Sequence, residues 1–126
     1  MIVKHIRYTD YDGNVREEEF RFNLSRAEGV EMIAQYPGGL KAYLNRIVST
    51  QDTAQLMALF KTLILKSYGV KTDDGKRFVK SEELSREFEQ TEAYSELVME
   101  LIRSSTAASE FVNAIIPEFP DPVMPE

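Results

Sequence analysis

The segment KSYGVKTDDGKRFVKS, residues 66–81, combines glycines, adjacent aspartates and lysines, which are residue types found in phosphate and metal sites. A phosphate loop needs G-x-x-x-x-G-K followed by Ser or Thr, because backbone amides, a lysine and a hydroxyl together hold the phosphates and magnesium. Gly69 and Gly75 enclose one residue too many for this motif, and Arg77 replaces the hydroxyl. An EF-hand would need alternating oxygen ligands and a final Glu. The segment therefore predicts a tight Asp-Asp-Gly turn without a ligand.

Other candidate chemical groups are isolated or spread over several faces. His5 is the only histidine and the chain has no cysteine, so neither a histidine cluster nor a thiolate site is available. The carboxylates of residues 17–19 and 82–83 are consecutive. Consecutive residues alternate between the faces of a strand and diverge around a helix, so these groups predict solvated surface instead of an acid–base pair. We expect no catalytic residue, no cofactor and no metal.

The composition is that of a soluble acidic protein. The chain of 126 residues carries a net charge of −6, is 43% hydrophobic, and fits one domain. No apolar run approaches the ~20 residues that cross a bilayer, and no apolar signal core follows the first residues, so we expect a cytosolic protein. Acidic charge disfavours nucleic acid. A local basic cluster is diluted by neighbouring carboxylates; it comprises Lys66, Lys71, Lys76, Arg77 and Lys80.

The first part of the chain predicts a β-hairpin. Residues 2–9 and 15–22 both alternate in side-chain character, and DYDG between them is a turn signal. On this alternation Ile2, Ile6 and Tyr8 share one face, and Phe20 and Phe22 share a face of the second strand. Because two strands alone are marginal in water, this face must pack on helices or on another copy.

Helix signals follow the hairpin. Ser25 and Glu28 form a capping box for a helix that starts at Arg26 and stops near Gln35, before a Pro-Gly-Gly turn. A second helix runs from Leu40 to about Val48. The strongest prediction is a third helix over residues 53–68, capped by Asp52 and ended by a left-handed Gly69. Its apolar arc is broad enough to imply contact on two sides.

The remaining chain predicts a short extended piece at Phe78 and Val79 and three further helices. Ser81 and Thr91 are caps for the first two, and the last helix begins near Thr106. The fold class is thus α+β and mostly helical, with an N-terminal hairpin (residues 1–24) and a compact bundle of five or six helices. We expect one domain over residues 1–116, and a proline-rich, extended and solvated tail over residues 117–126.

The helices carry much apolar surface for a chain of this size, and the hairpin needs a partner. These two features favour binding to other protein chains. Most apolar helix positions predict core, including Leu56, Leu59, Phe60, Leu63 and Tyr94. The candidates for contact with a client or a second copy are Met57, Leu65, Val98 and Met99. Methionine suits such a surface because its flexible thioether adapts to varied side chains.

The order of several segments resembles the tail assembly chaperone family of long-tailed (siphovirus-type) bacteriophages and prophages of Gram-positive bacteria. The segments are EEFRFNLSRAE, YPGGLKAYLNRIVST, the run from FKTLILKSYG to FEQTEAYSELVMELI, and AASEFVNAIIP. The likeness spans residues 8–117 and is most specific from Lys66 to Leu97. None of these segments is a catalytic motif, so the resemblance is one of overall pattern.

This resemblance implies a chaperone that is not an enzyme and that acts in the host bacterial cytoplasm. Such proteins coat the hydrophobic tape measure protein, keep it soluble while tail tube subunits assemble, self-associate, and are absent from the mature virion. Many of these families also make a longer form by ribosomal frameshifting. Neither nucleic acid nor a membrane is expected as a partner.

Two other functions remain open at the level of sequence. The chain could be a structural tail component that is retained in the virion, or a small acidic adaptor that regulates a host protein. A carboxylate surface that mimics DNA would have to be continuous, and the basic cluster of residues 66–80 argues against it.

Overall fold

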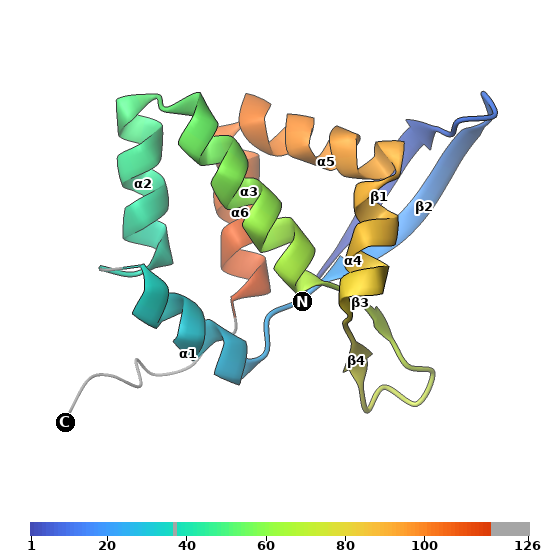
Figure 1. The fold of residues 1–126 in the computed structure, drawn as a ribbon, viewed down its shortest axis with the longest axis horizontal. Coiled ribbons are helices and arrows are strands. Elements are labelled where there is room, and N and C mark those ends of the chain that lie inside the picture. Colours follow the sequence, from blue (N-terminus) through green and yellow to red (C-terminus); the bar gives the residue numbers. More distant parts are fainter. Residues whose placement is uncertain (37, 117–126) are drawn as a thin grey trace.

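The computed structural model describes residues 1–36 and 38–116, with the side chains of residues 33 and 41 left out. The order of elements is β1 (Ile2–Thr9), β2 (Val15–Phe22), α1 (Arg26–Gln35), α2 (Leu40–Thr50), α3 (Thr53–Ser67), β3 (Tyr68–Lys71), β4 (Phe78–Val79), α4 (Glu82–Glu89), α5 (Glu92–Arg103) and α6 (Ser105–Ile115) (Figure 1). The predicted fold class, a mostly helical α+β protein with an N-terminal hairpin, is confirmed. The proline-rich tail predicted over residues 117–126 lies outside the described residues.

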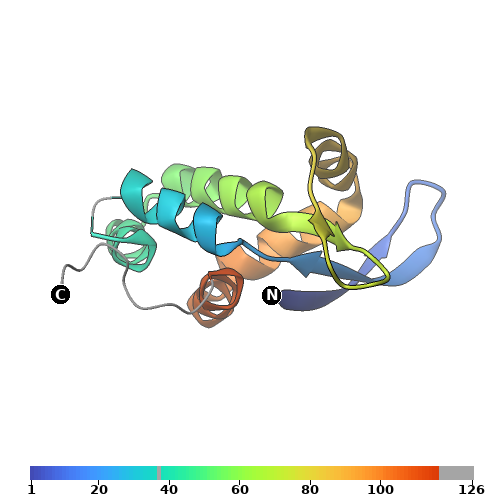
Figure 2. The same cartoon turned by 90° about the horizontal axis from the view of Figure 1, so that it is seen from below.

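The strands form one antiparallel sheet in the order β1-β2-β3-β4. The predicted hairpin is confirmed, and in it Ile2 pairs with Phe22 and Thr9 pairs with Val15. Figure 1 shows the hairpin tip reaching past the start of α5, while the smaller β3–β4 hairpin lies below α4. The view turned by 90° shows an elongated molecule, with the hairpin at one end and α1 and α2 at the other (Figure 2).

The hydrophobic core lies between the inner face of the sheet and the helices. From the sheet, Ile6, Tyr8 and Phe22 are buried, as the alternation predicted. Helix α3 is at the centre: it packs against α2, α4, α5 and β2, and Leu63 is completely buried. The broad apolar arc of this helix is therefore covered on several sides by the chain itself.

Most predicted helix starts are confirmed by their capping hydrogen bonds. The Ser25 hydroxyl accepts from the Glu28 amide while the Glu28 carboxylate accepts from the Ser25 amide, which completes the capping box of α1. Asp52, Ser81 and Thr91 accept from the third residue of α3, α4 and α5 respectively. Each cap satisfies an amide that has no partner within its helix.

The predicted end of the third helix is wrong. Its C-cap is Tyr68 in extended backbone, and Gly69 is a buried residue of β3 whose φ is not positive. A glycine is required there for a different reason, because a Cβ built on Gly69 would lie 2.6 Å from Phe78 Cε2 and 2.8 Å from the Val79 carbonyl oxygen. The close approach of β4, instead of a left-handed cap, explains this glycine.

Substitution of the two glycines in this region is expected to have different effects. Gly69→Ala should lower the free energy of unfolding by roughly 2–3 kcal/mol, because backbone of β4 must move to admit the methyl group. Gly75 has a φ of +74° in open space, so Gly75→Ala should cost only about 1 kcal/mol of backbone strain. Urea unfolding of both variants measures the difference. Equal losses would contradict the close packing of β3 on β4.

Candidate protein-binding surface

The four predicted contact residues do not form one surface. Met57 on α3 and Met99 on α5 are 44% and 43% exposed, whereas Val98 is only 7% exposed and belongs to the core. Leu65 is half-buried and lines a groove between α3 and α4. In this conformation Met57, Met99 and the edge of Leu65 are open to a partner, and Val98 is not.

The exposed apolar side chains are spread over most elements. Beyond the two methionines, large hydrophobic side chains are exposed in both hairpins and in α1 and α2; these are Met1, Val3, Tyr11, Val15, Val30, Val48 and Val70. The core side chains predicted on α3, Leu59, Phe60 and Leu63, are all buried, and Leu56 and Tyr94 pack against the core. Spare apolar surface is therefore smaller than the helix patterns predicted, and it consists of separate positions.

A charged groove of about 600 Å³ lies where α3, α4 and the start of α1 meet. All of its lining residues except Leu65 are polar or charged, and the charges are of both signs: Lys61, Lys66 and Arg86 are basic, and Glu82 and Glu89 are acidic. Lys61 forms an ion pair with Glu89 at 3.2 Å, which joins α3 to α4. The mixture of charges favours a structural joint between elements over an anion site.

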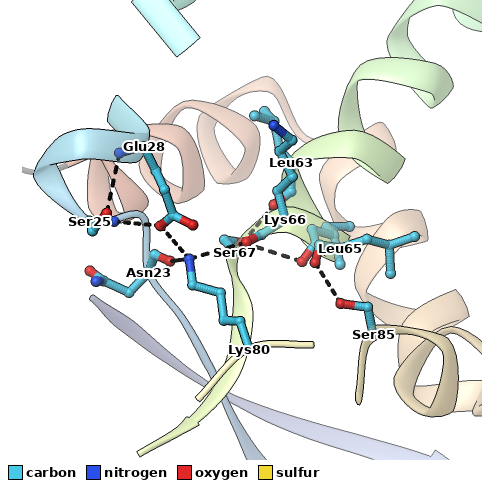
Figure 3. Close-up of polar contacts among 10 residues, drawn as sticks. Asn23, Ser25, Glu28, Leu63, Leu65, Lys66, Ser67, Lys80 and Ser85 are labelled. Atoms are coloured by element: carbon cyan, nitrogen blue, oxygen red, sulfur yellow. Dashed lines mark hydrogen bonds and ion pairs between the residues drawn. The ribbon is translucent and has the colours of Figure 1, made fainter. Parts of the chain in front are cut away.

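Lys80 is the centre of this joint (Figure 3). Its Nζ donates to the carbonyl oxygens of Asn23 at 2.8 Å and Lys66 at 3.2 Å, and to Glu28 Oε1. These acceptors come from the β2–α1 connection, α1 and the end of α3. Nearby, Ser85 Oγ donates to the Leu65 carbonyl oxygen at 2.8 Å and so ties α4 to α3. A lysine of the predicted basic cluster thus stabilises the fold.

Because of the ion pair between Glu28 and Lys80, the free energy of unfolding should depend on pH in the acidic range. Partial burial of Glu28 favours its neutral form, but hydrogen bonds from Lys80 and from the Ser25 amide outweigh this effect and lower its pKa below the ordinary 4.5. A carboxyl with a lowered folded-state pKa contributes stability above its unfolded pKa and loses it as the pH falls through the folded value. The urea midpoint should therefore fall more steeply between about pH 5 and pH 3 in the wild type than in Glu28→Gln.

A matched control for this prediction is available on the same helix. Glu31 is exposed, so Glu31→Gln makes the same change of charge without removing a hydrogen bond of the joint. We expect this variant to keep the acid slope of the wild type. If Glu28→Gln also kept it, the joint would not depend on the ionised carboxylate.

The residues first considered for chemistry have structural roles. Asp74 Oδ1 accepts from Thr72 Oγ1 and from the Lys76 amide, which makes the predicted turn between β3 and β4. His5 lies on the outer face of the hairpin, 3.2 Å from Glu19. Among the described residues no three His, Cys, Asp or Glu side chains are grouped to hold a metal ion. Within the same residues, none of the helices has the length and hydropathy needed to cross a bilayer.

The contacts of Lys80 could not be predicted from the sequence. Its acceptors are far apart in the chain, and two of them are backbone carbonyls, which leave no signal in the sequence. Only Ser25 with Glu28 could be read locally, as a capping box. The same carboxylate oxygen serves both the cap and the joint.

Comparison with known proteins supplies the functional context that this geometry lacks. A family model described as phage tail assembly chaperone matches residues 1–119. No curated protein matches the chain. No solved structure matches it either. Because the family model covers nearly all of the 126 residues, the chain belongs to the family of phage tail assembly chaperones.

Proposed function

We propose that this chain binds the tape measure protein of a long-tailed phage, keeps it soluble, and helps to recruit tail tube subunits around it. The observation that carries the proposal is the family match over residues 1–119. The order of segments from Lys66 to Leu97, which resembles chaperones of phages and prophages of Gram-positive bacteria, supports the same client. The chain acts by binding, without catalysis, in the cytoplasm of the host bacterium and leaves before the virion matures.

The exposed methionines supply the apolar contacts in this proposal. Met57 and Met99 lie on α3 and α5, two helices that pack on each other, and each exposes more than two fifths of its surface. Flexible thioethers accept varied side chains of an amphipathic client helix. Leu65 adds a smaller apolar contact at the edge of the charged groove. The net charge of −6 keeps the complex dispersed.

Self-association is part of the proposal because a single chain of 126 residues covers little of a long client. Several copies bound along the tape measure protein would present an exterior of net negative charge to the solvent. Each copy would contribute the same few apolar positions.

Co-expression tests the proposed client directly. The tape measure protein of the same phage or prophage is produced in bacteria with and without this chain, and its soluble fraction is measured. We expect several-fold more soluble tape measure protein when this chain is present, and copurification of the two. An unchanged soluble fraction would overturn the proposal.

Purified virions separate the proposal from a structural role in the tail. Quantitative mass spectrometry should find tail tube and tape measure protein but not this chain. Detection at a fixed copy number per particle would instead identify a tail component that stays in the virion.

A further inference from the structure

Both long edges of the β1–β2 hairpin are open over most of their length. Among residues 1–36 and 38–116, β1 pairs only with β2, and β3 pairs with β2 only at Arg21 and Phe22. The part of β2 nearer the hairpin tip therefore has a single neighbour. Neither strand contains proline, which is one of the residues that block a strand edge. Each edge is thus a template for one more strand.

The hairpin turn fixes which residues point to these open edges. The Asp10 amide donates to the Asn14 carbonyl oxygen at 2.8 Å, and successive strand residues point their backbone groups to opposite sides. The even-numbered residues therefore bond within the hairpin, and the odd-numbered residues bond outward. Arg21 follows this rule, because it pairs with Gly69 of β3.

The outward backbone groups of four residues define the two open edges. They belong to His5 and Arg7 on β1 and to Glu17 and Glu19 on β2. Within the described part of the chain, no backbone group outside the hairpin is hydrogen-bonded to them. Figure 2 places the hairpin at one end of the elongated molecule, away from α1 and α2. Both edges are therefore available to another chain.

The two edges carry opposite charge. β1 has Lys4, His5 and Arg7 and no acidic residue, whereas residues 15–19 of β2 have three glutamates and one basic residue, Arg16. Like charges directly opposite each other across a strand pair are destabilising. Two β1 edges would bring basic residues together, and two β2 edges would bring carboxylates together. Charge therefore favours pairing of the β1 edge of one copy with the β2 edge of another.

The charges on the outer face of the hairpin are accessible to a second copy. Arg7 and Glu17 are exposed and opposite each other in the register, and among the described residues neither has an ion-pair partner within 4.0 Å. His5 and Glu19 form a surface pair at 3.2 Å, in which their side chains remain 68% and 51% exposed. A strand added at either edge would meet these groups.

There is also space for a strand beside β1. A groove of about 330 Å³ has residues 5–7 as its strand wall, and its other wall is the end of α5. The helical wall carries both signs of charge, with Glu96, Glu100 and Arg103, and Glu100 already binds Lys4 Nζ. The opposite charges of the two strand edges therefore select the incoming strand.

A copy that is added in the same orientation continues the sheet. Its β1 runs antiparallel to β2 of the first copy, as β1 and β2 do inside one hairpin. The outward-bonding residues of the two strands then face each other, whether the register equals that of the hairpin or is shifted by two residues in either direction. In each of these registers His5 or Arg7 lies opposite Glu17 or Glu19.

We propose that copies of this chain associate head to tail, with the β1 edge of one copy paired to residues 15–19 of β2 in the next. Because the two paired surfaces differ, repeated addition gives a ring or an open helical filament. This inference rests on the self-association in the proposed function and is independent of the client.

Proline variants that block one edge each test the proposal. His5→Pro removes an outward donor from β1, and Glu17→Pro removes one from β2; proline is tolerated at such edge positions because the bonds within the hairpin remain. In native mass spectrometry each variant alone should assemble about tenfold or more weakly than the wild type, since an acceptor at the interface loses its donor. An equimolar mixture should form a dimer with one copy of each, because each variant keeps the edge that the other lacks.

His5→Ala and Glu17→Ala are the matched controls. They remove the same side chains and keep the amide donors, so each should assemble within about fivefold of the wild type, the loss expected for one cross-strand charge pair. Urea midpoints of all four variants establish that the hairpin is folded.

Several outcomes would overturn the proposal. Equal assembly of the wild type and both proline variants would place self-association elsewhere on the chain. Normal assembly of Glu17→Pro beside a defect in His5→Pro would indicate a symmetric pair of β1 edges, and a mixture without the mixed dimer would exclude head-to-tail pairing. A monomeric wild type would remove self-association from the proposed function, while the co-expression assay still decides on the client.

Discussion

Replacing Phe88 by alanine is expected to lower the free energy of unfolding by about 3–5 kcal/mol. Phe88 is 2% exposed and is the buried residue by which α4 holds to the core. Its ring stacks on Tyr68 at 4.6 Å between centroids and lies 5.0 Å from Phe20 and 5.7 Å from Phe22. One side chain thus joins α4 to β2 and β3, so its loss opens a cavity between all three elements.

Denaturant unfolding measures this loss, and two variants bracket it. Phe88→Leu keeps most of the volume and should cost less than about 2 kcal/mol. Tyr11→Ala removes an aromatic ring that is 76% exposed at the hairpin tip, and should change stability by about 0.5 kcal/mol or less. If Phe88→Ala lowered the free energy of unfolding no more than Tyr11→Ala does, the packing of α4 would not depend on the contacts of Phe88 with the aromatic rings of β2 and β3.

The second large effect is expected at the methionines. In the co-expression assay, Met57→Lys combined with Met99→Lys should return the soluble tape measure protein to within about twofold of the level without chaperone. A buried apolar side chain contributes roughly 1.5–3 kcal/mol to an interface, and a lysine in its place must also be desolvated. Both positions are exposed in the free chain, and lysine is a good helix former, so the variant should stay folded.

A matched control separates loss of contact from loss of fold. Val15 and Val70 are exposed apolar residues on β2 and β3 and not on α3 or α5, and replacing both by lysine adds the same charge. This control should solubilise the client as the wild type does. If both double variants failed equally while their urea midpoints remained normal, added charge and not the methionine positions would explain the defect.

Local signals in the sequence predicted most of the fold. The two strands of the hairpin follow from the alternation in residues 2–9 and 15–22, and Ile6, Tyr8 and Phe22 on its inner face are buried as expected. The helix starts follow from Ser25, Asp52, Ser81 and Thr91, whose side chains accept the amide bonds that these residue types favour at caps. These elements were predictable because each depends on residues that are close together in the sequence.

Features that depend on distant contacts were not predictable in this way. Strand β3 follows α3 without a loop, and it pairs with Arg21 and Phe22 of a strand far earlier in the chain. A glycine after a long helix is more often a left-handed cap, so Gly69 was misinterpreted until its contact with Phe78 was visible. The Lys80 joint has the same origin, because its acceptors come from separate elements.

The candidate contact surface shows where periodicity is informative and where it is not. Val98 and Met99 are neighbours on α5 and differ by about 100° around the helix. Val98 shares the face of Leu97 and Leu101, and all three are buried, whereas Met99 is exposed. The buried position of Val98 follows from this periodicity, although the residue was first predicted to contact a client or a second copy. Periodicity gave no indication of which exposed residue binds a client.

Native mass spectrometry of the purified chain, alone and mixed with the tape measure protein, tests the central claim most directly. The account predicts assemblies of several copies for the chain alone, and a complex that contains both proteins after mixing. A chain that remains a monomer in both samples, with the tape measure protein unbound, would contradict it.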